Sequence, residues 1–399
     1  MNIDINQNYW LTVEPYVYIN FTQNSVLLYN TLDAAYTEST NPLIVELMRQ
    51  ICVKENCGVC LLTSKNLTND DVRSFIIDIR EKFIGDILPV ALSEGRPVQL
   101  ISLLNFQQDK MRLNDDKMKE NIEPSISIGE NILENLHEVN LFFEEKNDLG
   151  IEVYSDILIQ MENVPRINLC GEFLKYPQLP LLVNFLSKTQ GNKAIVTDYQ
   201  DINVNDILTA NLDEGYSFQV NVDFPLDNKK QWDSLITLIS SSKRKIKFVF
   251  GIKNEADIDE VEKMIIDYKI EDYQFSPIYN SQNIDFFKDN VFLTKDDIFS
   301  TPLSMKEIFA NQTLNTYNFG RIFIKSNGDV LTKKNTKPIG NIKKDTIKKI
   351  IFDEISEGNS WLEIRNQQPC SNCLYQWLCP SPSEYEKAIN KPNLCHVEP

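Results

Sequence analysis

The sequence has very few histidines, no long hydrophobic run and no glycine-rich phosphate loop. Two of its 399 residues are histidine, which is too few for a credible Ser–His–Asp hydrolase arrangement. No glycine loop of the Walker type is present, so a nucleotide-binding P-loop is not expected. No segment approaches the roughly eighteen consecutive apolar residues of a membrane span. We therefore expect neither a membrane protein nor an enzyme of these two classes.

The sequence also lacks an excess of basic residues. It has 40 Lys and Arg against 57 Asp and Glu, which gives a net charge of −17 and an isoelectric point near 4.7. A surface this negative repels phosphate backbones and anionic lipid heads, so neither nucleic acid nor a membrane is an expected partner. A basic or apolar peptide would be attracted.

The N-terminal segment does not have the pattern of a secretory signal. Met1–Tyr9 is polar and lacks a charged region followed by an apolar one. A cytoplasmic location is therefore expected. In that reducing compartment the eight cysteines are more often metal ligands than disulfide partners.

The first ninety residues are predicted to form an α+β domain, residues 1–90. Val13–Phe21 and Val26–Leu32 are rich in strand-forming residues, and Asp33–Thr37 is a possible third, shorter strand. Pro42 stands at a good first position for a helix. The polar residues Thr68–Asp71 are a capping signal for a second helix.

Residues 96–300 alternate between apolar strands and amphipathic helices, which predicts an α/β region with a parallel sheet. The sheet is either open or a partial barrel, and the number of repeats favours the barrel. The expected strands are Val98–Leu104, Val139–Phe143, Ile167–Cys170, Ala194–Val196, Phe218–Val222, Lys247–Gly251 and Tyr273–Ile278. The clearest helices between them are Leu179–Ser187, Trp232–Ser241 and Ala256–Tyr268.

Residues 301–399 are predicted to form a third region. Arg321–Lys325 and Val330–Lys333 read as a β-hairpin around the tight turn Asn327-Gly328. A helix at about Thr346–Glu357 follows, and the chain then becomes rich in cysteine.

The strongest chemical signal is the spacing Cys370-x2-Cys373-x5-Cys379, with Cys395 further on. Two thiolates separated by two residues can bind one site, and two more distant thiolates complete a four-sulfur shell. Zinc and a [4Fe–4S] cluster both accept four thiolates, so the ligand count alone does not choose between them. Four unrelated buried cysteines are a third interpretation. His396 neighbours Cys395 but is expected beside the shell or at the surface.

The tail Pro369–Val397, PCSNCLYQWLCPSPSEYEKAINKPNLCHV, resembles the SPASM region of radical-SAM peptide maturases. It is especially similar to the pseudo-radical-SAM proteins of the Bacteroidales double-glycine peptide systems, and the resemblance covers nearly the whole chain. It implies a partial (β/α) barrel of radical-SAM type in residues 96–300 and a SPASM-like domain in residues 301–399. For residues 1–90 it implies a winged-helix-like domain that recognises a precursor peptide.

The first barrel strand and loop of the family resemble Val98–Arg112 in this chain. Active enzymes carry three cysteines in that loop, spaced x3 then x2, which leave one iron open for S-adenosylmethionine. Here the loop holds Asn105-Phe106-Gln107-Gln108 and no cysteine. The resemblance therefore implies that S-adenosylmethionine is not used.

The segment Leu169–Leu174 is similar to the Gly-Gly-Glu strand end that holds the methionyl part of S-adenosylmethionine in the family. Cys170, Gly171 and Glu172 are the matching positions, and Cys170 replaces a glycine. We interpret these positions as a relic cofactor site. An ordinary strand end that turns at Gly171 is an equally good interpretation.

SPASM regions usually hold ligands for two auxiliary clusters, and this chain keeps one set. Gly328 matches a family glycine, but the cysteine positions around it and after Cys379 fall on Lys333 and Ser383. The four retained cysteines belong together as one shell. Loss of one whole shell beside a complete second shell favours one [4Fe–4S] cluster, with zinc as the alternative, because a partial thiolate shell contributes no binding energy to folding.

In the peptide-recognition domain of the family, a leader peptide adds as a strand at a sheet edge. The order of predicted strands and helices places this edge at the short strand formed by Asp33, Ala34, Ala35, Tyr36 and Thr37. Leu47, Phe75 and Ile79 would lie beneath it, and the same three residues also have an ordinary core interpretation.

The resemblance implies a non-catalytic accessory protein that binds a ribosomally made precursor peptide with a double-glycine leader and presents it to a genuine radical-SAM maturase. The alternative is an active enzyme. In one form Cys52, Cys57 and Cys60, spaced x4 then x2, build an atypical cluster; in the other, the tail cluster carries electrons. A structural protein with a zinc knuckle is a third possibility.

Overall fold

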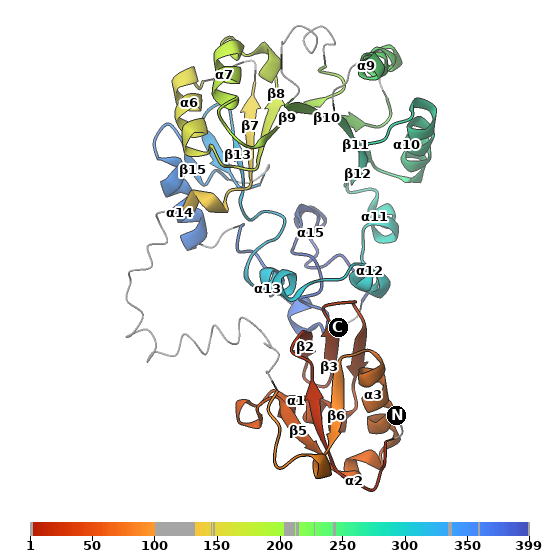
Figure 1. Cartoon of the computed structure of the whole chain (residues 1–399). Helices are drawn as coiled ribbons and strands as arrows, with labels where there is room; N and C mark the ends of the chain where they lie inside the picture. Colours follow the sequence, from red (N-terminus) through yellow and green to blue (C-terminus); the bar gives the residue numbers. More distant parts are fainter. Residues whose placement is uncertain are drawn as a thin grey trace. The chain divides into compact units, whose positions relative to one another are not determined.

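The computed structural model describes residues 3–99, 132–144, 146, 148–202, 212, 215–226, 228–241, 245–333, 337–357 and 360–397. The chain divides into two compact units (Figure 1). The first unit combines Met1–Glu123, Leu293–Thr316 and Ile364–Pro399, and the second combines Pro124–Phe292 and Tyr317–Glu363. The predicted region 301–399 thus contributes to both units.

A nine-stranded sheet forms the centre of the second unit, in the order β12-β11-β10-β9-β8-β7-β13-β14-β15. The strands from β12 to β13 are parallel to their neighbours, and β14 and β15 are antiparallel. The predicted α/β class is therefore confirmed. The strands are β7 (Glu138–Phe143), β8 (Arg166–Gly171), β9 (Asn192–Asp198), β10 (Tyr216–Asp223), β11 (Ile246–Ile252), β12 (Tyr273–Pro277), β13 (Arg321–Ile324), β14 (Asp329–Leu331) and β15 (Gly340–Asn341).

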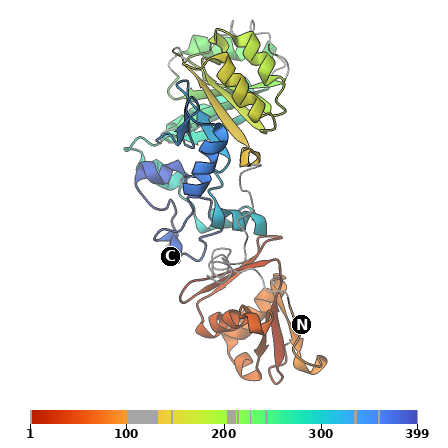
Figure 2. The same ribbon diagram turned by 90° about the vertical axis from the view of Figure 1, so that its left-hand side faces the viewer.

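The helices of this unit lie on one side of the parallel strands. From β7 to β12 the strand order in the sheet follows the order in the sequence, and right-handed crossovers then place every connecting helix on the same face. Figures 1 and 2 show the helices on the outer side of an arc of strands. They are α6 (Ile151–Gln160), α7 (Leu179–Leu186), α9 (Lys229–Ser241) and α10 (Glu255–Tyr268).

The burial of the strands agrees with this one-sided cover. In β10, buried Tyr216, Phe218, Val220 and Val222 alternate with partly exposed residues, as expected when one face of a sheet packs against helices. Trp232 of α9 is fully buried, and its ring centroid lies 5.3 Å from that of Phe248.

Polar side chains occupy the opposite face of the central strands. Asn168 donates a hydrogen bond of 2.8 Å to Asn140, and Asn140 donates one of 3.2 Å to the Ile322 carbonyl of β13. Both amides are buried, so these bonds satisfy groups that would otherwise be costly to bury.

The predicted hairpin in the second unit is confirmed. Gly328 has a φ of +93°, a conformation that glycine adopts without steric cost. The N–H of Gly328 donates to the Lys325 carbonyl at 2.9 Å. Helix α14 (Ile347–Glu357) follows, close to the predicted helix. In the predicted strand Val98–Leu104, Val98 and Gln99 belong to no strand; its other residues and the loop Asn105–Gln108 lie outside the described residues.

The first unit contains two antiparallel three-stranded sheets, β5-β1-β6 and β2-β3-β4. Their strands are β1 (Tyr9–Val13), β2 (Val17–Phe21), β3 (Val26–Asn30), β4 (Tyr36–Ser39), β5 (Val59–Leu62) and β6 (Gly85–Pro89). The prediction of one strand over Val13–Phe21 was wrong. Pro15 has no N–H to donate to a ladder, and the chain turns there from the first sheet into the second.

The predicted third strand is shifted along the chain. Asp33 and Ala34 lie in a turn, in which Asp33 Oδ1 accepts a hydrogen bond of 2.9 Å from the Ala35 N–H and Ala34 has a φ of +64°. Asp and Asn favour such turns because their side chains bond the backbone two residues on. β4 therefore begins at Tyr36.

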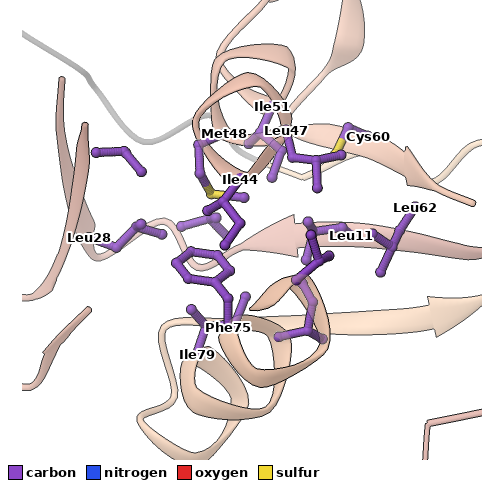
Figure 3. Close-up of a cluster of buried hydrophobic side chains, with 14 of the residues drawn as sticks. Leu11, Leu28, Ile44, Leu47, Met48, Ile51, Cys60, Leu62, Phe75 and Ile79 are labelled. Carbon is purple, nitrogen blue, oxygen red and sulfur yellow. The ribbon is translucent and has the colours of Figure 1, made fainter. Parts of the chain in front are cut away.

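Helices cover one face of the sheet β2-β3-β4. Helix α1 (Pro42–Ile51) starts at the predicted proline, and α3 (Asp70–Glu81) is capped by Asn69, whose side chain accepts from the Val72 N–H at 3.2 Å. A shorter helix, α2 (Ser64–Leu67), lies between them in sequence. Leu28, Met48 and Phe75 meet in the core between the sheet and these helices (Figure 3). Leu47 and Ile79 are buried in the same core, which confirms their core interpretation.

The C-terminal part of the chain covers the opposite face, which we call the outer face of the sheet. Tyr18, Leu27 and Tyr29 on this face pack against Ile298, Ile308, Tyr375, Trp377 and Leu378. These partners come from α12 (Lys295–Phe299), α13 (Met305–Thr313) and the tail, residues 364–397, which includes α15 (Glu384–Ile389). The sheet is thus the middle layer of the unit.

None of the helices in the described parts of the chain is long and apolar enough to cross a membrane.

Gly171, at the end of β8, is expected to be intolerant of a side chain. Its φ is +77°, and an added Cβ would lie 2.5 Å from the Phe143 carbonyl oxygen of the neighbouring strand. We expect Gly171→Ala to lower the free energy of unfolding by about 1–3 kcal/mol, measured by chemical denaturation. Gly95→Ala is the control, because an added Cβ there meets nothing within 4 Å. Equal stability of the two variants would contradict the prediction.

Candidate metal centre

The four tail cysteines line one cavity in the first unit. Cys370, Cys373, Cys379 and Cys395 share its wall with apolar side chains that include Leu293, Ile298 and Pro369. The four cysteines of the predicted shell thus lie around the same cavity. None of the eight cysteines of the chain forms a disulfide.

Local backbone structure positions three of the thiols. Cys370 starts a short 3-10 helix, Cys370–Asn372, and Cys373 caps its end, with its N–H donating to the Cys370 carbonyl at 3.0 Å. This turn is why a spacing of two residues directs both thiols to one cavity. Cys379 ends the next turn, and its N–H donates to the Tyr375 carbonyl at 3.2 Å.

The fourth thiol reaches the cavity through a pairing between distant segments. The Leu293 N–H donates to the Leu394 carbonyl at 3.0 Å, and the His396 N–H donates to the Leu293 carbonyl at 2.9 Å. These two bonds form a parallel bridge between Leu293 and Cys395. His396 is exposed and does not line the cavity.

Burial opposes ionisation of the thiols. It raises the pKa of Cys379 to about 12 and also raises the pKa values of Cys370 and Cys373. The Arg365 guanidinium acts in the opposite direction on all three, whereas each thiolate would raise the pKa values of its neighbours. A metal that binds here must therefore displace protons.

Arg365 brings a fixed positive charge to the thiols. Its Nη1 lies 4.0 Å from Cys370 Sγ, and its Nη2 donates to Glu386 Oε1 at 2.7 Å. Both side chains are almost completely buried, at 8% and 7% exposure. On the other side of the cavity, Asn393 Nδ2 donates to Cys395 Sγ at 3.2 Å. Hydrogen bonds to cysteine sulfur stabilise thiolates and tune a metal centre.

The donor set around the cavity is all sulfur, which zinc and iron–sulfur sites both accept. In the described ranges of the chain, however, no group of three or more His, Cys, Asp or Glu side chains is placed to hold a metal ion.

The trio near the N-terminus is placed differently. Cys52 follows α1 and Cys60 lies in β5, and both pack with the apolar core of the first unit. Burial raises the pKa of each to about 12. Cys57 ends a 3-10 helix and is not part of this core. This is the placement of ordinary free cysteines, two in the core and one in a loop.

The relic positions lie at the carboxyl end of β8. Cys170 is buried, and Gly171 comes close to the backbone of β7. Glu172 pairs with Lys175 at 2.8 Å and lines a cleft of about 460 Å³ together with Glu144 and Asp148. The close approach of the β7 backbone to Gly171 is sufficient to explain why this position is glycine.

The two other positions where the family has cysteine are structural here. Lys333 Nζ is buried and pairs with Glu363 at 2.7 Å. Ser383 caps α15, and its N–H donates to Glu386 at 2.9 Å. The Ser383-x-x-Glu386 capping box is a sequence signal for the start of α15, but it does not indicate that Glu386 pairs with Arg365.

β4, which holds part of the predicted peptide-binding edge, pairs only with β3 among the described strands. On one side, Lys82 Nζ of α3 donates to the Tyr36 carbonyl at 2.8 Å and Thr37 hydrogen-bonds Asp78. On the outer face, the Tyr36 ring stacks on Phe299 at a centroid distance of 3.7 Å. Asp33, Ala34 and Ala35 precede the strand.

A charged triad joins β4 to the tail. Glu38 accepts hydrogen bonds from Lys295 at 2.7 Å and from the Tyr375 hydroxyl at 2.5 Å. Burial disfavours the charge of Glu38, but these hydrogen bonds outweigh burial and lower its pKa. Burial and the bond to Glu38 raise the pKa of Tyr375 to about 12. The sequence analysis missed this triad because its members lie far apart in the chain.

Replacing Arg365 is expected to destabilise the first unit strongly. Arg365→Met leaves the buried carboxylate of Glu386 without its partner, a change that typically costs about 3–5 kcal/mol. The double variant Arg365→Met/Glu386→Gln should recover much of this loss, because Gln can still accept the capping bond. Chemical denaturation measures both. Arg73→Met, in an exposed pair with Asp70, is the control and should cost at most about 1 kcal/mol; an equal cost for Arg73→Met would refute the role of burial.

The contribution of Glu38 to stability is expected to depend on pH. Because its pKa is lowered in the folded state, its charge stabilises the fold above the unfolded pKa, about 4.3, and this stabilisation is lost as the pH falls through the folded pKa. Wild type should therefore be more stable than Glu38→Gln at pH 7 and lose this advantage in acid. Denaturation midpoints at both pH values test this, with Glu46→Gln on the exposed side of α1 as control. A pH-independent difference would count against the triad.

No model of a known protein family matches the sequence, and a search of curated proteins finds no significant match either.

Proposed function

We propose that this protein is a non-catalytic relative of the radical-SAM peptide maturases. It binds a ribosomally made precursor peptide with a double-glycine leader and carries one [4Fe–4S] cluster on Cys370, Cys373, Cys379 and Cys395. Its partner is a genuine radical-SAM maturase in the cytoplasm. The observation that carries the proposal is the cavity lined by these four thiols, in the same compact unit as the sheet β2-β3-β4.

The pattern of kept and lost cysteines supports a cluster over zinc. The family's cysteine positions for one auxiliary shell fall on Lys333 and Ser383, whereas all four positions of the other shell are cysteine. In a [4Fe–4S] cluster each of four thiolates binds its own iron atom. The sulfur-only donor set, the guanidinium of Arg365 and the Asn393 N–H all suit a cluster with a net negative charge.

A closed shell of four protein thiolates supports a structural role or electron transfer, because it leaves no iron free for a substrate. The cluster would supply redox capacity, whereas the protein chain supplies the fold around it. Asn20 Nδ2 of β2 donates to the Leu374 carbonyl at 2.8 Å, directly beside Cys373. A loaded centre would thereby hold the tail against the outer face of the sheet.

The loop that the resemblance assigns to the open cluster supports the absence of catalysis. The segment Val98–Arg112 holds Asn105-Phe106-Gln107-Gln108 there and no cysteine. The cleft at the carboxyl end of β7 and β8 is lined by the carboxylates of Glu144, Asp148 and Glu172. Thiolates are the ligands that iron–sulfur clusters require.

The edge of β4 supports peptide binding. The Ala35 carbonyl accepts from the Asn30 N–H of β3 at 2.8 Å, and antiparallel pairing alternates the direction of backbone groups. The backbone groups of Tyr36 and Glu38 therefore face away from β3, toward the position of an added strand. Of these groups, the Tyr36 carbonyl already accepts a hydrogen bond from Lys82 Nζ at 2.8 Å, so the Tyr36 N–H and the backbone groups of Glu38 are the ones that an added strand would use. The net charge of −17 favours a basic or apolar peptide and disfavours nucleic acid and membrane surfaces.

Anaerobic reconstitution tests the cluster. We expect wild type to bind about four iron and four sulfide per chain, and Cys379→Ser to lose most of both. Cys60→Ser, a buried cysteine outside the cavity, is the matched control and should retain them. Addition of S-adenosylmethionine should leave the spectrum unchanged. Stoichiometric zinc without iron, or formation of 5′-deoxyadenosine, would refute the proposal.

A further inference from the structure

A second, larger cleft lies in the first unit beside the thiol-lined cavity. Its volume is about 830 Å³, within the range of ligand-binding clefts in proteins. Three segments form it: the end of β2 with the β2–β3 turn (residues 21–25), the end of β4 with the next residue (38–40), and the tail (368 and 371–375). Cys373 lines both the cleft and the thiol cavity.

The cleft is lined mainly by neutral hydrogen-bonding side chains. Six of them make no side-chain hydrogen bond within the part of the chain that the structure describes: Gln23, Asn24, Thr40, Gln368, Ser371 and Asn372. Amide and hydroxyl groups both donate and accept hydrogen bonds, so they can serve the N–H and C=O groups of a peptide backbone.

The cleft wall carries almost no free charge. Glu38 is the one Asp, Glu, Lys or Arg residue in the lining, and its carboxylate is already paired with Lys295 at 2.7 Å. In a chain with a net charge of −17, a neutral cleft of this size is unusual. A charged ligand segment would lose hydration there without gaining a partner, whereas an uncharged segment would not.

The cleft is continuous with the end of β4. Glu38 and Ser39 belong both to this strand and to the cleft wall. Every strand pair in the sheet is antiparallel, so a peptide added to β4 in the same manner would have its preceding residues beside Ser39 and Thr40. Those residues would enter the cleft.

We propose that this cleft binds an uncharged, extended segment of the precursor peptide, namely the residues that precede the segment paired with β4. This inference rests on the proposed function, because it assumes that β4 binds a peptide. It adds a second subsite, one wall of which is the loop that holds Cys373. The peptide would therefore lie directly beside the metal centre.

Selection and binding measurements test the subsite. A phage-displayed library of random linear peptides is selected on the full-length, anaerobically reconstituted protein, and the recovered sequences are synthesised with a fluorophore. Fluorescence anisotropy then gives their affinities for wild type and for variants. Asn372→Arg introduces a bulky charge into the cleft, and Tyr36→Pro removes an outward backbone N–H at the edge of β4. Asn184→Arg, at an exposed position of α7 in the other unit, is the matched control.

We expect Asn372→Arg and Tyr36→Pro each to weaken binding at least about tenfold, and Asn184→Arg to leave it unchanged. Asn24→Arg, on the opposite wall, should repeat the loss, and unchanged circular dichroism excludes misfolding as its cause. If only Tyr36→Pro weakens binding, the cleft subsite is refuted and the β4 edge stands. If only the cleft variants do so, the edge part of the proposed function is refuted. Peptides insensitive to all of these variants would overturn both.

Discussion

Burial of both faces of the sheet β2-β3-β4 is the constraint on which the first unit depends. One face packs against α1 and α3, and the outer face packs against the tail through Tyr18, Tyr29 and Trp377. A three-stranded sheet needs an apolar partner to be stable, and here the second partner is the segment that carries the cysteines. The thiol-lined cavity and the edge of β4 thus belong to one packing arrangement, in which Tyr375 of the tail hydrogen-bonds Glu38 of β4.

The parallel sheet could be predicted because short apolar strands alternate along the sequence with amphipathic helices, and β7 to β12 lie within a few residues of their predicted positions. In the first unit, local backbone conformations made the predicted strand boundaries wrong. Pro15 divides one predicted strand into β1 and β2, and the turn at Asp33 moves β4 along the chain. Each of these details depends on a single residue. The hydrogen bonds that the rest of the fold offers decide what effect that residue has.

The four-cysteine cavity could be predicted from spacing alone because thiolates of one shell must lie close together. The charged and polar side chains around this cavity could not be predicted from the sequence. Arg365, Glu386, Lys295 and Glu38 reach the site from segments that carry no shared pattern, and Asn20 bonds Leu374 across 354 positions of sequence. Pairings over such distances have no local signal. A buried ion pair such as Arg365–Glu386 can be recognised only once the packing around it is known.

The discontinuous make-up of the first unit has a consequence for its synthesis. The sheet β2-β3-β4 is synthesised long before α12, α13 and the tail that cover its outer face. Tyr18, Leu27 and Tyr29 therefore stay without these partners while more than 250 residues in between are made. Closure of so long a loop is slow, and apolar surface exposed in the meantime promotes aggregation. The nascent chain should consequently be prone to aggregation until residues 364–397 have emerged.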